Sequence, residues 1–183
     1  MKNIIKYQIV ITFICLATIS FGQSFPKSIG FINDFEKIFT EKQIENLDSI
    51  VRDFENKTSI EIAIITLDNS YTNKEEFDDY TLKLANQWGI GKKDKDNGVL
   101  IAISSSLRKM RINNGYGIEK LISDNETKEI IENQFIPYFK KDEYFNGTET
   151  GLIKLIEKLS LGDVNVDSQI DSISICGIPL KSP

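Results

Sequence analysis

Oxygen-donor side chains gather in three short segments of the sequence, FINDFEKIF, KKDKDNG and NNGYGIEKLISDNE. The donors are carboxylates and side-chain amides: Asn33, Asp34, Asp94, Asp96, Asn97, Asn113, Glu119 and Asp124. Such groups bind hard cations, and Ca²⁺ tolerates irregular loop geometry better than Mg²⁺ does. Each segment alone is more typical of a solvated turn or a helix cap. The three segments together allow an all-oxygen site for a divalent cation.

The residues that the sequence lacks exclude several kinds of chemistry. The chain contains no histidine, which excludes Ser-His-Asp triads, Cys-His nucleophiles and the usual zinc sites. Of its two cysteines, Cys15 lies in a segment that we expect to be removed, so Cys176 has no intramolecular disulfide partner. A metal ion bound by the mature chain must therefore be held by oxygen atoms.

The loop between Trp88 and the apolar strand VLIAIS contains glycines, lysines and acidic residues, so three functions compete for it. It is not an EF-hand loop, because its ligand positions do not alternate as required and no helix follows it. It is not a phosphate-binding P-loop, since those loops follow a strand and precede a helix, and this loop does the reverse. A solvated turn and a cation site remain.

Residues 1–22 have the features of a secretory signal peptide, with a basic start, an apolar stretch and small residues at Ser20 and Gly22. We expect cleavage after Gly22 and export to the periplasm or the extracellular space. Removal takes away two lysines and no acidic residue, which changes the formal net charge from −5 to −7. A chain this acidic repels nucleic acids and anionic lipids. We expect no membrane span in the mature chain.

Hydrophobic periodicity and helix caps predict the elements that position these residues. Three capping boxes mark helix starts: Thr40 with Gln43, Asn73 with Glu76, and Ser123 with Glu126. The predicted helices cover 41–57, 73–88, a stretch after Ser123 that bends or ends at Pro137, and 145–159. The predicted strands are 59–67, 99–104 and 108–113.

This order of elements predicts a three-layer α/β/α sandwich with a central mixed sheet, a Rossmann-like α/β fold. Strands 59–67 and 99–104 should be parallel because a helix connects them, and 108–113 should form a hairpin with 99–104. We expect four segments along the chain: a signal peptide at 1–22, an N-terminal lead-in at 23–29, one domain at 30–160, and a C-terminal tail at 161–183.

Several motifs resemble the TPM-domain family. These are WGIGKKDKDNGVLIAIS, followed by LRKMRINNGYGIEKLISD, with INDF and SIEIAIITL upstream. The resemblance extends over roughly residues 30–159. The family includes thylakoid-lumen proteins linked to photosystem II repair, a modulator of acetylcholine receptors and many bacterial envelope proteins, and its fold is an α/β/α sandwich.

The resemblance implies a calcium site. Positions of this chain that match the acidic and amide positions of the family are Asp34, Asp96, Asn97, Glu119 and Asp124. Some plant relatives are credited with acid phosphatase activity. Many bacterial relatives carry a transmembrane helix after the domain, which this sequence lacks, so an exported protein without that tether is expected.

Three functions follow from these observations. The first is a non-catalytic module that binds Ca²⁺, or Mg²⁺, and acts on envelope proteins as a monomer. The second is a metal-assisted phosphatase, with Asp34 or Asp96 as nucleophile or base and Arg108 or Arg111 holding the phosphate. The third is a partner-binding domain without a ligand. The first is our principal expectation.

Overall fold

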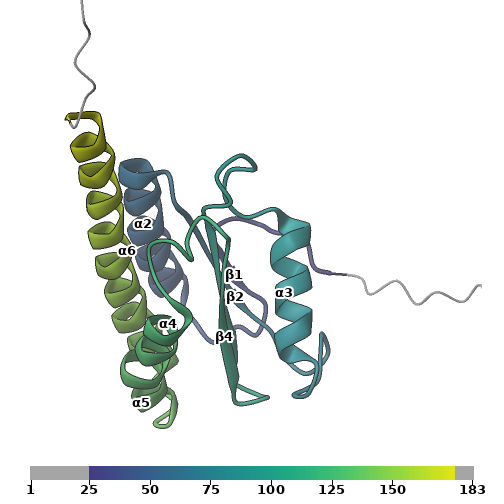
Figure 1. The fold of residues 1–183 in the computed structure, drawn as a ribbon. Helices are drawn as coiled ribbons and strands as arrows, with labels where there is room; N and C mark the ends of the chain where they lie inside the picture. The colour runs from purple at the N-terminus through teal and green to yellow at the C-terminus, as the bar shows by residue number, and fades with distance from the viewer. Residues whose placement is uncertain (1–24, 176–183) are drawn as a thin grey trace, which may run out of the picture.

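The structure is a computed structural model that describes residues 25–175, and side chains as far as residue 161. At its centre lies a four-stranded sheet in the order β1–β2–β3–β4. The strands are β1 (Ile32–Asp34), β2 (Glu61–Thr66), β3 (Gly98–Ser104) and β4 (Lys109–Asn114). Helices cover both faces of this sheet (Figure 1), which confirms the predicted α/β sandwich.

The directions of the strands decide which loops meet. Strands β1, β2 and β3 are parallel, and β4 is antiparallel to β3, which confirms the predicted mixed sheet. The carboxyl ends of β1, β2 and β3 therefore lie at one end of the sheet, and the carboxyl end of β4 lies at the other. The sequence does not predict β1, because three residues are too few to show a period.

One face of the sheet carries the larger core. Helix α2 (Glu41–Thr58) begins at the predicted capping box, in which Thr40 and Gln43 exchange hydrogen bonds. Helix α6 (Tyr144–Ile175) packs beside it. The buried side chains that these two helices supply are Leu47, Val51, Phe54, Leu152, Leu155 and Leu159. Each contributes about 1.5–3 kcal/mol by leaving water.

The other face carries α3 (Phe77–Trp88). Its start differs from the prediction: the Asn73 side chain accepts a hydrogen bond from the Glu76 N–H at 2.9 Å, but this bond closes a turn, and the helix begins after it. Residues of the predicted lead-in complete this core. The Phe25 ring lies 5.0 Å from the Tyr80 ring, and the Trp88 indole N–H donates to the Pro26 carbonyl at 2.8 Å.

Between β4 and α6, the chain forms a continuous helical segment of changing type. It consists of α4 (Asp124–Ile130), the π-helix η1 (Ile131–Phe135) and α5 (Ile136–Phe139). The predicted capping box of Ser123 and Glu126 is present. Pro137 lies in the first turn of α5, directly after the π-helix. The predicted bend at Pro137 is thus a π-helical turn just before it.

Helix α6 continues beyond the predicted end at 159 and takes in residues expected to form the start of the tail at 161–183. None of the helices in residues 25–175 is long and apolar enough to cross a membrane. The predicted signal peptide, 1–22, lies outside the described residues, as do residues 176–183.

Candidate functional site

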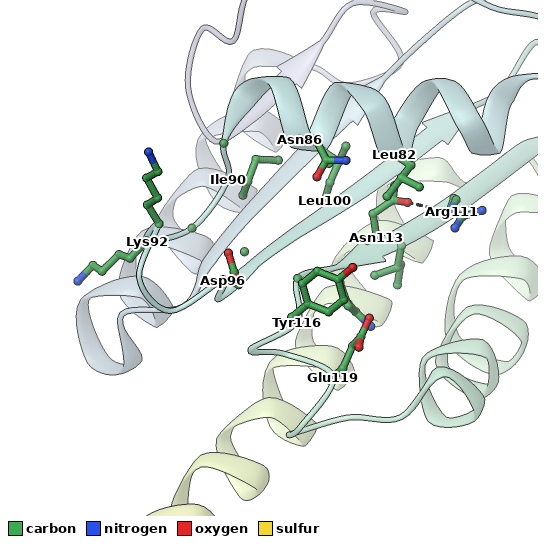
Figure 2. A pocket seen from close by; sticks show the side chains of 18 of the residues that line it. Leu82, Asn86, Ile90, Lys92, Asp96, Leu100, Arg111, Asn113, Tyr116 and Glu119 are labelled. Atoms are coloured by element: carbon green, nitrogen blue, oxygen red, sulfur yellow. Dashed lines mark hydrogen bonds between the residues drawn. The ribbon is translucent and has the colours of Figure 1, made fainter.

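A pocket of about 800 Å³ lies at the end of the sheet where β3 begins and β4 ends. Its walls come from the second half of α3, the loop between α3 and β3, the last residues of β4 and the loop that leads to α4. Figure 2 shows Asp96, Tyr116 and Glu119 around this pocket. The KKDKDNG and NNGYG segments, which the sequence places apart, therefore form one site.

Closely packed backbone forms part of the pocket wall. A side chain at Gly98 would overlap the carbonyl group of Ile90, because the loop before β3 folds back onto the start of that strand. The Gly91 N–H in the same loop donates to the Glu61 carboxylate at 2.9 Å. Gly91 of the WGIG motif and Gly98 of the NG motif thus allow close backbone packing beside the pocket.

The second glycine motif joins the two loops of the pocket. The Gly117 N–H donates to the Asp96 carbonyl at 3.0 Å, and a side chain at Gly117 would overlap the Lys95 carbonyl oxygen. Asp96 itself has a positive φ of 47°, a conformation in which Asn and Asp are over-represented among residues other than glycine. These backbone contacts place Asp96 at the edge of the pocket.

Three of the five predicted cation ligands line this pocket: Asp96, Glu119 and Asp124. Asp124 is the first residue of α4, directly after the N-cap Ser123. Among the described residues, however, no three Asp, Glu, His or Cys side chains lie close enough to hold a metal ion together. The carboxylates share the pocket without converging on one point.

Asn97 does not face the pocket. Its side chain is 8% exposed. The amide oxygen accepts from the Lys92 N–H at 2.8 Å, and the amide nitrogen donates to the Ser59 carbonyl at 2.6 Å. Both polar atoms of this amide are therefore hydrogen-bonded, and they hold the loop against the residue that follows α2.

Asp34 lies at the opposite end of the sheet from the pocket. It ends β1, which is parallel to β3, whereas Asp96 precedes β3. The Asp34 carboxylate accepts from the backbone N–H of Ile38 at 3.2 Å and of Phe39 at 2.9 Å, and from the Thr66 hydroxyl. The structure does not bring Asp34 together with the other predicted ligands.

The pocket includes an oxygen atom that sequence reasoning missed. The Oδ1 atom of Asn114 is buried and has no hydrogen-bond partner, while its Nδ2 atom donates to the Thr127 hydroxyl at 3.0 Å. Asn114 lines the pocket. A buried amide oxygen without a partner is costly, and a cation or a water molecule would satisfy it. The feature of the sequence that could have identified Asn114 is its position next to Asn113 in the NNGYG motif.

Cationic side chains line the same pocket. They are Lys92, Lys93 and Arg111. The Arg111 Nε–H donates to Asn113 at 2.8 Å, and Asn113 in turn donates to Thr81 on α3 at 3.2 Å. Arg108, the other predicted phosphate ligand, pairs with Asp142 at 3.2 Å and does not line the pocket.

The start of α4 is anchored next to the pocket by Glu126. Its carboxylate accepts from the Ser123 N–H at 3.0 Å and from the Ser123 hydroxyl, and it pairs with Lys158 on α6. The Ser123 N–H, followed by the Lys158 ammonium, lowers the pKa of Glu126 to about 2. This cap fixes the position of the neighbouring Asp124.

A family model for the TPM domain matches residues 32–158. The chain belongs to the TPM-domain family. No curated protein matches this TPM domain in sequence. Among solved structures, it is similar to the N-terminal domain of a protein from P. gingivalis, with 29% identity and a TM-score of 0.65, over 70% of this chain and 81% of that chain.

Two further solved structures share the fold. The BA42 protein from the psychrophilic bacterium Bizionia argentinensis has 23% identity and a TM-score of 0.56, over 72% of this chain and 85% of that one. The N-terminal domain of the cg2496 protein from Corynebacterium glutamicum has 14% identity and a TM-score of 0.52, over 80% and 88%. At these identities the similarity concerns the fold.

Proposed function

We propose that this TPM domain binds a divalent cation, with Ca²⁺ favoured over Mg²⁺, in the pocket at the start of β3. The observation that carries the proposal is that Asp96 from the loop before β3, and Glu119 and Asp124 from the segment after β4, line one pocket. Their proximity raises the mutual repulsion of three negative charges, which a bound cation would relieve. Binding would therefore stabilise the folded state.

The chemistry of the donors supports a hard cation. With no histidine in the chain, the pocket offers carboxylate and amide oxygens, and Asn114 adds a buried oxygen that lacks a partner. Because the three carboxylates do not converge, binding would require Glu119 and Asp96 to move toward the ion. Such adjustment suits Ca²⁺, which accepts irregular coordination, better than Mg²⁺.

In this proposal, two of the predicted ligands have structural roles. Asn97 and Asp34 hold loops in place and are not cation ligands. The domain would act as a non-catalytic module on other envelope proteins, after export directed by residues 1–22 and cleavage after Gly22. N-terminal sequencing of the exported protein tests the cleavage, with Gln23 expected as its first residue.

Calorimetric titration of chelator-treated protein with Ca²⁺ tests the cation site. We expect measurable heat and a rise in melting temperature, since a ligand at 100 times its Kd stabilises by about 2.7 kcal/mol. Asp96→Asn and Glu119→Gln should each weaken binding at least tenfold. Asp53→Asn removes one exposed carboxylate on α2 and should bind as the parent does. If the titration releases no heat and the melting temperature does not change, the proposal is wrong.

A second candidate function is a metal-assisted phosphatase, favoured by Arg111 and the two lysines in the wall of the same pocket. Arg111 would bind phosphate oxygens, and Asp96 would accept a proton from the attacking water. A cation held there would polarise the phosphoryl group. A phosphomonoester assay with and without Ca²⁺ or Mg²⁺ tests this. Turnover that Asp96→Asn leaves unchanged would not come from this pocket.

A further inference from the structure

Strand β4 is an open edge of the sheet. It is the last strand in the order β1–β2–β3–β4, and no strand of the described residues pairs with its outer side. In Figure 1 it stands at the front of the sheet, with α3 on one side and the α2–α6 layer on the other, and no helix covers its edge. An uncovered edge strand presents backbone donors and acceptors to solvent.

The pairing of β4 with β3 identifies which backbone groups are free. The Gly115 N–H donates to the Gly98 carbonyl at 2.9 Å. This bonded pair lies next to the pair Asn114 and Val99, which face each other across the two strands. In an antiparallel pair of strands, hydrogen-bonded residue pairs alternate with pairs that are not hydrogen-bonded. The backbone groups of Arg111 and Asn113 therefore bond to β3. The N–H and C=O groups of Met110, Ile112 and Asn114 then point outward, with no partner in residues 25–161.

The pocket and two exposed apolar side chains lie along this edge. Residues 111–114 of β4 all line the pocket, so the pocket runs beside the free backbone groups. Leu82 on α3 is 43% exposed, and Tyr116 after β4 is 76% exposed. Both line the pocket (Figure 2). The tight packing of Gly117 against the neighbouring loop holds Tyr116 in this exposed position.

The charges indicate the kind of segment that would fit. The carboxylates of Asp96, Glu119 and Asp124 lie along the route. The two lysines of the pocket wall, Lys92 and Lys93, both belong to the loop between α3 and β3, and Lys92 points away from Asp96 and Glu119 in Figure 2. The basic groups on β4, Lys109 and Arg111, are directed to Asp78 on α3, at 3.4 and 3.9 Å. A second copy would bring a net charge of −5 against the same charge, whereas a basic segment would be attracted.

We propose that the open edge of β4 and the adjoining pocket bind an extended, basic segment of a partner protein, which adds to the sheet as a fifth strand. Backbone hydrogen bonds to Met110, Ile112 and Asn114 would provide affinity for any extended chain. Leu82 and Tyr116 would contact its apolar side chains, and the pocket carboxylates would select its basic ones. This inference does not rest on cation binding.

A set of short synthetic peptides tests the inference in buffer containing EDTA, so that its outcome is separate from that of the calcium titration. The probe is a capped hexapeptide of alternating lysine and valine, added to the exported full chain labelled with ¹⁵N. In the free protein, amide hydrogens of residues 110, 112 and 114 should exchange faster than those of 111 and 113. The peptide should slow the first group by at least tenfold.

Peptide variants separate backbone pairing from simple charge attraction. Methylating every second backbone nitrogen gives two isomers. One should lose at least tenfold in affinity because its methyl groups face β4, and the other should bind as the parent does. Replacing lysine by glutamate should abolish binding. If both isomers bind as the parent does, or if the amide exchange at the edge does not change, the proposal is wrong.

Protein variants test the apolar contacts. Leu82→Ala and Tyr116→Ala should each weaken peptide binding about tenfold without lowering the melting temperature, because both side chains are exposed. Ile153→Ala, at an exposed position on α6 with 52% exposure, is the control and should bind as the parent does. Protection of the edge amides that rises with protein concentration would show that a second copy occupies the edge, and would overturn the assignment to a basic partner.

Discussion

The Asp34 carboxylate holds together the turn that follows β1. It accepts two backbone N–H groups and the Thr66 hydroxyl, so it connects β1, β2 and the approach to α2. Asp34→Asn removes the charge and turns one oxygen into a donor, which leaves an N–H group without a partner. We expect a loss of about 1–3 kcal/mol in the free energy of unfolding, measured by urea denaturation.

The same variant tests whether Asp34 is independent of the calcium site at the other end of the sheet. Asp34→Asn should retain the calcium affinity of the parent at a temperature where both are folded. A loss of calcium binding equal to that of Asp96→Asn would contradict the separation described above.

Gly117 limits how closely the two pocket loops can approach. A methyl group there would overlap the Lys95 carbonyl, so Gly117→Ala must push the loops apart or strain them. We expect a loss of about 1–3 kcal/mol, the usual cost of overpacking. Gly89→Ala is the contrasting variant: no atom lies near its added methyl group, and its penalty comes from a positive φ of 64° alone.

These two variants should differ in a second measurement. Gly117→Ala should shift the backbone resonances of residues 94–97 and 115–119 together, because the loops share one contact. Resonance changes confined to the loop that carries the substitution would show that the loops move independently.

At the scale of elements, the cap of α4 makes stability depend on pH. The pKa of Glu126 is lowered to about 2 from its ordinary value of 4.5. A lowered carboxyl pKa stabilises the fold above the unfolded pKa, and this stabilisation is lost as pH falls through the folded pKa. The melting temperature should therefore fall between pH 4.5 and 2, and Glu126→Gln should remove part of that fall.

The control for this prediction is Glu129→Gln, on the same helix. The pH dependence of its melting temperature should match that of the parent. Both variants require melting curves at several pH values and constant ionic strength. An identical pH dependence in Glu126→Gln and the parent would contradict the role of the cap.

The sequence predicted the elements that have strong periodicity or a complete cap. Strands β2 and β3 consist of apolar runs, and the capping boxes of α2 and α4 are found where predicted. It failed where tertiary contacts decide. β1 exists because it pairs with β2, and the π-helical turn before Pro137 packs the Phe135 ring against Gly151. No local pattern encodes these contacts.

The structure brings only some of the predicted ligands into one pocket, for a related reason. Asp96, Glu119 and Asp124 line one pocket because β3 and β4 are antiparallel neighbours, which the hairpin pattern already implied. The position of Asp34 at the other end of the sheet could not be predicted, because Asp34 ends β1, a strand that the sequence does not reveal. The burial of Asn97 and the free oxygen of Asn114 depend on side-chain contacts that no spacing rule supplies.

At the scale of the molecule, residues of the predicted lead-in, before residue 30, pack against the core. Phe25 and Pro26 close the core over α3. Burial raises the pKa of Tyr80 to about 12. A chain shortened to begin at Gly30 should unfold at a lower temperature, and its Tyr80 pKa should fall toward 10. Ultraviolet titration against a Tyr80→Phe control measures this, and an unchanged pKa would contradict it.

Each strand of the sheet after β1 pairs with the strand before it in the sequence. As the chain emerges from a ribosome or a translocation channel, each new strand therefore meets a partner that has already emerged. Helix α6 comes last, and its leucines complete the larger core. Until residue 159 has emerged, one face of the finished sheet lacks that cover. A chaperone would find its binding surface on this nearly complete chain.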